Sequence, residues 1–242
     1  MKNFLYMLIG LFFWSFIISN DALPEKRNAP HNSSISVSNN YQIVRDIYSH
    51  CNLSGKLNFD IFNLAMEGYN KLCPVNKNIL TIIDFTKPST KKRMFIIDIK
   101  NRKLLIQTYV AHGKNSGLNY ATKFSNRKGS LQSSLGFYLT AETYFGKHGY
   151  SLMIDGVEKG INDNARRRSV VIHGANYVSE KFIEKNHRLG RSWGCPAVPE
   201  KLSKQIIDLI KGGSCLFIYA NETDYLTRSI TTSYGENGEN SS

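Results

Sequence analysis

The chain has 242 residues, a length that fits one domain with terminal additions or two small domains. Hydrophobic residues make up 41% and charged residues 21%, which provides enough apolar material for a core and excludes disorder of the whole chain. Four cysteines are too few for a disulfide-rich scaffold, and no pattern of Cys and His matches the spacing of zinc ligands. We therefore expect no structural metal.

The chain is strongly basic, with 31 Lys and Arg against 19 Asp and Glu and a net charge of +12. The basic residues lie in small groups, such as residues 91–93 and 166–168, and no nucleic-acid recognition motif surrounds them. We therefore expect no nucleic-acid partner. The excess charge indicates a solvated basic surface or affinity for an acidic polymer.

Residues 1–20 contain one Lys followed by an apolar stretch that is too short for a comfortable membrane span. This composition predicts a secretory signal peptide, so we expect an exported protein of the periplasm or cell envelope with no stable membrane insertion after cleavage. Because the cleavage site is not a clean Ala-x-Ala, an uncleaved N-terminal anchor is the alternative. Residues 21–40 have a turn-forming composition and are predicted to form a linker.

Two helices are predicted over residues 41–50 and 58–72, because apolar residues recur there at helical spacing. Together they predict a helical hairpin over residues 41–76. Cys51 and Cys73 follow the two helices directly. Antiparallel packing would place these cysteines at opposite ends of the pair, although an oxidising compartment leaves a disulfide between them open.

The apolar pattern then becomes typical of strands. The predicted strands cover residues 79–85, 93–99, 104–113, 135–145, 150–156, 169–175 and 214–220. A short helix is predicted after Ser179 and a longer one from Pro199. We therefore expect a mainly β domain over residues 79–222, followed by a flexible tail over residues 223–242.

The residues that indicate chemistry lie at the end of one predicted strand and in a later loop. His173 ends an apolar run, and Cys195 lies in the sequence Ser-Trp-Gly-Cys-Pro, within a polar, basic loop. Cys215, inside an apolar strand, is typical of an inert core cysteine. An imidazole can take the proton of a thiol and stabilise the thiolate, so we expect His173 to be the base for Cys195. Gly194 would allow a tight turn that directs backbone amides at an oxyanion.

This paired pattern resembles the YkuD-like catalytic domain of the L,D-transpeptidases of peptidoglycan, in which His-Gly is followed by Ser/Thr-His-Gly-Cys. The similarity extends over residues 81–220 and includes YVAHGKNSG, QSSLGFYLT, KHGYSLMIDG and GRSWGCPAVP. It is greatest to the branch with Ser-Trp-Gly-Cys. The resemblance implies a β-sandwich-like catalytic domain after the helical hairpin. It also implies a thioester between Cys195 and a peptidoglycan stem peptide, and no cofactor.

By this resemblance Cys195 is the nucleophile and His173 the proton acceptor. The active loop and oxyanion site are then shaped by Ser192, Trp193, Gly194 and Gly174. Trp193 stands where other branches have a second His, and it cannot accept a proton. His112 and His187 are the residues that could compensate.

Arg188 and Arg191 lie shortly before Cys195 and offer planar donors that match a carboxylate. We expect them, together with His112, to contact the carboxylates of the stem peptide. The alternative is that both arginines face solvent or form contacts with a purely structural role.

Three other functions fit parts of the pattern. An L,D-carboxypeptidase shares the first half-reaction and uses water as the acceptor, and a non-catalytic wall-binding module would keep the fold without the activity. A sortase also places His before Cys, but it needs a Thr-Leu-x-Thr-Cys-like run and an Arg on a neighbouring strand. Here only Arg228 follows, in the predicted tail.

Overall fold

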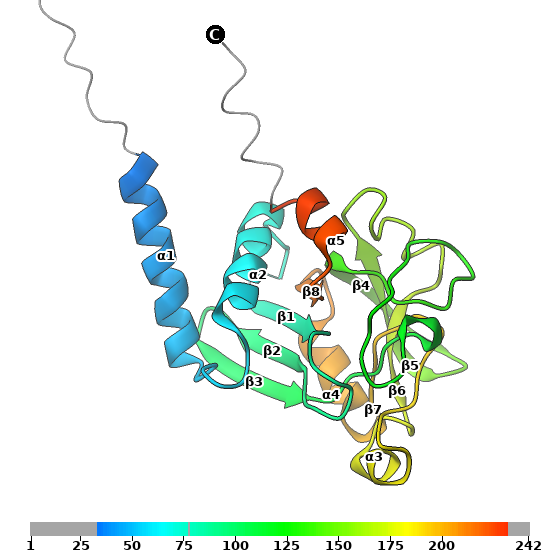
Figure 1. The fold of residues 1–242 in the computed structure, drawn as a ribbon. Helices are drawn as coiled ribbons and strands as arrows, with labels where there is room; N and C mark the ends of the chain where they lie inside the picture. The colour runs from blue at the N-terminus through cyan, green and yellow to red at the C-terminus, as the bar shows by residue number, and fades with distance from the viewer. Residues whose placement is uncertain (1–32, 77, 232–242) are drawn as a thin grey trace, which may run out of the picture.

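A computed structural model describes residues 33–76 and 78–231 of the chain (Figure 1). The signal peptide predicted over residues 1–20 lies outside the described residues, as does most of the predicted linker. Within the described ranges, none of the helices combines the length and apolar character needed to cross a membrane.

The predicted helical hairpin is present as α1, Ser33–His50, and α2, Phe59–Leu72. Figure 1 shows the two helices antiparallel and side by side. The side chain of Asn58 caps α2 by accepting a hydrogen bond from the Asp60 N–H at 2.6 Å. Cys51 is buried and Cys73 is exposed, and both are free thiols.

One boundary differs from the prediction, because α1 begins at Ser33, inside the range 21–40 that the composition predicts to be a linker. The C-terminal half of α1 is fixed by packing, since Val44 and Ile47 are buried in the core. Once those turns have formed, each further residue adds a backbone hydrogen bond that offsets the entropy lost when the residue is fixed. The helix therefore extends into a sequence that has no apolar periodicity of its own.

Eight strands form one mixed sheet in the order β3-β2-β1-β8-β4-β5-β6-β7. Their bounds are β1 Ile79–Asp84, β2 Met94–Asp98, β3 Lys103–Thr108, β4 Gly136–Gly146, β5 Gly149–Gly156, β6 Val171–Ala175, β7 Ala197–Pro199 and β8 Cys215–Tyr219. The last strand, β8, lies in the middle of the sheet, parallel to β1 and antiparallel to β4. The short strand β7 and the 3-10 turn η1, Lys114–Ser116, were not predicted.

The two edges of the sheet meet. Beyond the end of β3, Ala111 forms an antiparallel bridge with Ala197 of β7, through N–H···O bonds of 2.8 and 3.3 Å. The mainly β domain with a helical hairpin before it is therefore confirmed. The predicted sandwich is formed not by two separate sheets but by one continuous sheet that curls until its edge strands touch.

Helices cover both faces of the central strands. α4, Glu200–Ile210, buries Ile206, Ile207 and Ile210, and Ile210 accepts a 2.6 Å hydrogen bond from the Thr140 hydroxyl of β4. On the other face, α2 approaches β4 so closely that a Cβ at Gly68 would lie 2.1 Å from the Phe137 ring. Residues of the hairpin and of the sheet share one hydrophobic core, so the hairpin packs as part of the β domain and not as a separate unit.

The predicted flexible tail is partly wrong, because residues 223–231 fold back onto the domain. α5, Thr223–Arg228, buries Tyr225. The buried carboxylate of Glu158 accepts hydrogen bonds from the Ser229 hydroxyl and the Ile230 N–H, both at 2.9 Å. A polar contact of this kind leaves no periodic apolar signal in so short a segment. Residues 232–242 lie outside the described residues.

Candidate active site

The parallel pairing of β6 with β7 places Cys195 beside β6. His173 lies opposite Ala197 in this ladder, and Cys195 comes just before β7. The Val171 N–H lies 3.4 Å from Sγ of Cys195, and Sγ lies 3.7 Å from the Ser169 carbonyl oxygen. His173 is therefore two residues along β6 from the backbone N–H that contacts the thiol.

Ser192 holds the turn that carries the thiol. Its hydroxyl donates to the Cys195 carbonyl at 2.6 Å and accepts from the Gly194 N–H at 3.0 Å. Gly194 has a φ of 127°, which favours glycine, and a Cβ there would lie 2.9 Å from the Gln132 carbonyl oxygen. No hydrogen bond within residues 33–76 and 78–231 uses the Cys195 N–H, so this donor is free to bind an oxyanion.

Gly174 has a packing role in the structure. A Cβ at this position would lie 2.8 Å from the Ser203 hydroxyl oxygen and 3.3 Å from Cα of Glu200. Both neighbours belong to α4, so the absence of a side chain allows the helix to lie close against β6. The residue next to His173 is thereby fixed.

His173 has one ring nitrogen committed to the backbone. It is 2% exposed, and Nδ1 lies 2.9 Å from the Gly174 carbonyl oxygen. Because a carbonyl oxygen only accepts, Nδ1 carries the proton and Nε2 keeps its lone pair. Burial lowers the pKa of His173, and the nearby His148 and Lys147 act in the same direction. The ring is therefore a neutral base near neutral pH.

Burial raises the pKa of the Cys195 thiol, while the Val171 N–H and the positive charges of Arg168 and Lys147 partly oppose that shift. The resting thiol is therefore protonated and needs a base. In the described structure, Sγ has hydrogen-bond partners on β6 and in the preceding turn, and the His173 ring is not one of them. Rotation of side chains must bring the pair together, as is common in sites without substrate.

The tip of the β4–β5 hairpin covers the site. The sequence analysis did not predict this contact. The His148 ring stacks on the His173 ring, with centroids 4.3 Å apart and planes at 21°. Lys147 lies with Nζ 4.8 Å from the centroid of the Trp193 ring, which is 70% exposed. Trp193 therefore contacts the hairpin tip. Lys147 and His148 lie in the sequence KHGYSLMIDG, which carries part of the family resemblance. Their contacts with Trp193 and His173 form only when the sheet folds.

Arg168 was also missed, because its basic run reads as solvated surface. Its guanidinium donates to the Ser125 carbonyl at 2.6 Å, to the Ser134 hydroxyl at 3.0 Å and to the Gln132 carbonyl. Nη2 lies 3.4 Å from the Cβ position of Gly194. Arg168 thus joins the loop over residues 125–134 to the turn that carries the thiol.

The two histidines considered as substitutes for the missing second His are structural. His112 is 1% exposed, its Nδ1 lies 2.8 Å from Nη2 of Arg93, and its Nε2 lies 3.4 Å from the Gly117 carbonyl oxygen. Burial and the Arg93 charge lower the pKa of His112 to about 3. His187 is exposed and caps α3, Glu180–Asn186. The expectation that His112 contacts substrate is therefore corrected.

The two arginines before Cys195 donate hydrogen bonds to backbone carbonyls of the protein. Arg191 donates from Nη1 to the Lys114 and Gly117 carbonyls, both at 3.1 Å. Arg188 donates from Nη1 to the Leu189 carbonyl at 2.8 Å. Both side chains are half-buried. Substrate binding by these arginines stays a prediction.

A family model described as the L,D-transpeptidase catalytic domain matches residues 53–219. The chain therefore belongs to the family of L,D-transpeptidase catalytic domains. The matched range begins in the turn between α1 and α2 and ends with β8, so α5 lies beyond it. Among curated proteins none matches this chain.

Solved structures of the same class are similar at low identity. An L,D-transpeptidase from Mycobacterium smegmatis has 12% identity over 59% of each chain, with a TM-score of 0.37. The helical cell shape determining protein Pgp2 from Campylobacter jejuni, as a K307A mutant, has 12% identity over 62% of this chain and 50% of its own, with a TM-score of 0.40. An L,D-transpeptidase from Xylanimonas cellulosilytica has 13% identity over 59% and 60%, with a TM-score of 0.34. The chain thus spans less than two thirds of the length of these structures.

Proposed function

We propose that this protein is a cysteine acyltransferase that acts on peptidoglycan stem peptides as an L,D-transpeptidase. The observation that carries the proposal is the pairing of β6 with β7, which puts Sγ of Cys195 beside the Val171 N–H and two residues from His173. A neutral imidazole with a free Nε2 and a protonated thiol form the pair that nucleophilic catalysis needs.

In the first half-reaction, Nε2 of His173 takes the thiol proton and the sulfur of Cys195 attacks a peptide carbonyl carbon. The Cys195 N–H, which has no other partner among the described residues, stabilises the negative charge on the carbonyl oxygen. Collapse of this intermediate breaks the C–N bond. His173 returns its proton to the leaving amine, and a thioester remains on Cys195.

In the second half-reaction, the amine of another stem peptide attacks the thioester and loses a proton to His173, and the thiol is restored. The cross-link is then an amide bond. The alternative is an L,D-carboxypeptidase, in which water takes the place of the amine. Both reactions use the same residues, so the acceptor alone separates them.

We also propose that the protein works outside the cytoplasm, since residues 1–20 have the composition of a signal peptide. Peptidoglycan would then be within its reach. N-terminal sequencing of protein recovered from the cell envelope tests this proposal, and an intact Met1 terminus in a membrane fraction would favour the anchor.

Incubation of the purified protein with a disaccharide-tetrapeptide, followed by mass spectrometry of the products, tests the reaction. A cross-linked dimer is the product of a transpeptidase, and a shortened monomer is the product of a carboxypeptidase. If neither forms, the wall-binding module is the better account.

A further inference from the structure

One turn of the chain lies over the ring of His173. In the β4–β5 hairpin Gly146 pairs with Gly149, so Lys147 and His148 are the two residues of the turn. Gly149 has a φ of 72°, in the left-handed region that favours glycine, and this conformation directs the chain back along β5. The His148 ring then stacks on the His173 ring, with centroids 4.3 Å apart and planes at 21°. The turn therefore brings a second imidazole against the face of the proposed base.

The hairpin reaches this place through contacts that do not use His148 itself. The Tyr150 hydroxyl donates to the Asp208 carboxylate of α4 at 2.9 Å, and Ser151 lies opposite His173 in the β5–β6 ladder. Within the part of the chain that the structure describes, no hydrogen bond or ion pair uses the His148 ring. The place of this ring is therefore set by the hairpin and by stacking on His173.

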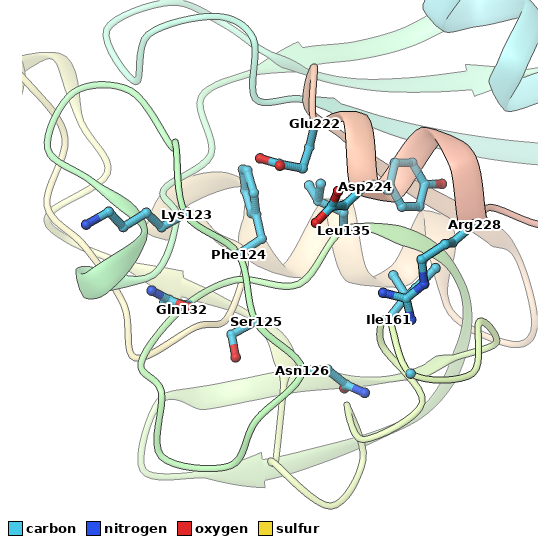
Figure 2. A pocket seen from close by; sticks show the side chains of 12 residues that line it. Lys123, Phe124, Ser125, Asn126, Gln132, Leu135, Ile161, Glu222, Asp224 and Arg228 are labelled. Carbon is cyan, nitrogen blue, oxygen red and sulfur yellow. The ribbon is translucent and has the colours of Figure 1, made fainter.

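The turn that carries the thiol is held by different contacts. The Gln132 carbonyl oxygen lies 2.9 Å from the Cβ position of Gly194 in that turn. The Gln132 and Ser125 carbonyls accept hydrogen bonds from Arg168. Figure 2 shows Ser125 and Gln132 on their loop, which also lines a cavity beside α5. None of these contacts uses His148, so a change of its side chain leaves the thiol-bearing turn supported.

The stack acts on His173 in two ways. The His173 ring is 2% exposed while the turn over it is exposed, so the turn is part of what keeps water from the ring. Burial is the largest cause of the lowered pKa of His173, and a positive charge on His148 acts in the same direction. A ring that is stacked face to face also cannot turn about its Cβ–Cγ bond without losing that contact. Because Nδ1 is held at the Gly174 carbonyl, the direction of Nε2 is then fixed.

We propose that His148 is a positioning residue for the base, whose ring shields the His173 imidazole from water and fixes its plane during acylation. The contribution to acylation rests on the proposed function, whereas the shielding of His173 does not. An aromatic ring without an ionisable group should serve nearly as well, because both effects depend on the flat face of the ring.

A titration of the His173 ring by NMR tests the shielding without any substrate. The full chain is labelled with ¹⁵N-histidine, and the His173 signal is identified by its loss in His173→Gln. His148→Ala should raise the pKa of His173 by about 0.5 or more, because water reaches the ring and a neighbouring positive charge is lost. His148→Phe should raise this pKa less, since the cover is kept. The matched control is His50→Ala, at an exposed histidine of α1, which should leave the pKa unchanged.

Single-turnover acylation by a disaccharide-tetrapeptide tests the positioning. His148→Ala should lower the maximal rate about tenfold or more and leave the half-saturating substrate concentration unchanged, because the base is misplaced while the substrate contacts remain. His148→Phe should restore most of the rate, and His50→Ala should match the wild type. The acid limb of the rate should move to higher pH in His148→Ala, in step with the titration. The unfolding temperature verifies that each variant is folded.

The outcomes separate this proposal from the proposed function. An unchanged titration of His173 in His148→Ala overturns the shielding. A wild-type rate in that variant, or a slow rate that His148→Phe does not restore, overturns the positioning. A raised pKa together with a slow rate that His148→Phe restores supports the proposal. If the wild type forms no thioester, the proposed function fails, while the titration still decides whether His148 shields His173.

Discussion

His173 is a buried histidine with a free Nε2, and that state makes a direct prediction. His173→Gln keeps the polar contact to the Gly174 carbonyl but removes the base. Loss of a general base typically costs about 100-fold to 10,000-fold in rate. Single-turnover acylation, measured by stopped flow, should therefore slow by that amount. The unfolding temperature of the same variant should lie close to that of the wild type, which separates a loss of catalysis from a loss of folding.

The pH dependence of acylation should follow the same residue. The base works only when neutral, so activity is lost as pH falls through the lowered pKa of His173. Because burial and the charge of Lys147 both lower that pKa, the acid limb should lie below the ordinary value of about 6.5.

Lys147→Gln removes a positive charge that lowers the pKa of His173, so the acid limb of kcat/KM should move to higher pH. Lys147 is exposed, and solvent screens its charge, so we expect a shift of less than about one pH unit. A pH-rate profile of the variant measures it. Lys159→Gln, a change at another exposed lysine, is the control, and an identical shift there would point to a general effect of net charge.

At the scale of the element, the turn over residues 192–195 depends on one glycine. Gly194→Ala would place a Cβ 2.9 Å from the Gln132 carbonyl oxygen. It would also put a residue with a side chain at a backbone φ of 127°, which favours glycine. Strain of this kind costs about 1–3 kcal/mol, and relief of the strain moves the thiol away from β6. Acylation should fall by more than about tenfold. Thiol labelling at Cys195 should persist, and wild-type acylation in this variant would contradict the role given to the turn.

The local pattern of apolar and turn-forming residues predicted much of the fold. It did not predict the elements that form through contacts between residues far apart in the chain. The strands around Ile82, Phe95 and Phe217 were found because they are short apolar runs between turn residues. β7 was missed because Ala197–Pro199 has only three residues and is a strand through pairing with β6 and Ala111. α5 was missed because its place depends on Glu158, which lies in the turn after β5, far away in the sequence.

The candidate site divides in the same way. The family motif predicted His173 and Cys195 as the catalytic pair, because the residue types and their spacing can be read directly from the sequence. Lys147, His148 and Arg168 reach the site only through the folding of the sheet, and no periodicity marks them. His112 was expected to contact the substrate, whereas the structure buries it beside Arg93.

At the scale of the whole molecule, the C-terminal segment is part of the domain. Tyr225 is 4% exposed, packs in the main core and contributes to the cavity beside the active site. Tyr225→Ala should destabilise the fold by about 3 kcal/mol, the usual size of a large-to-small aromatic change in a core. Thermal or urea unfolding measures the loss, and Thr227→Ala on the exposed side of α5 should change stability little.

The most direct test of the account is the intact mass of the protein after brief exposure to a disaccharide-tetrapeptide, with the reaction stopped by acid while the acyl-enzyme is still present. We predict an added acyl group, located by peptide mapping at Cys195, in the wild type and in Cys215→Ala, because Cys215 is buried in β8. The adduct and all turnover should be absent in Cys195→Ala. Turnover that survives in Cys195→Ala, or an acyl group on any other residue, would contradict the proposed thioester mechanism.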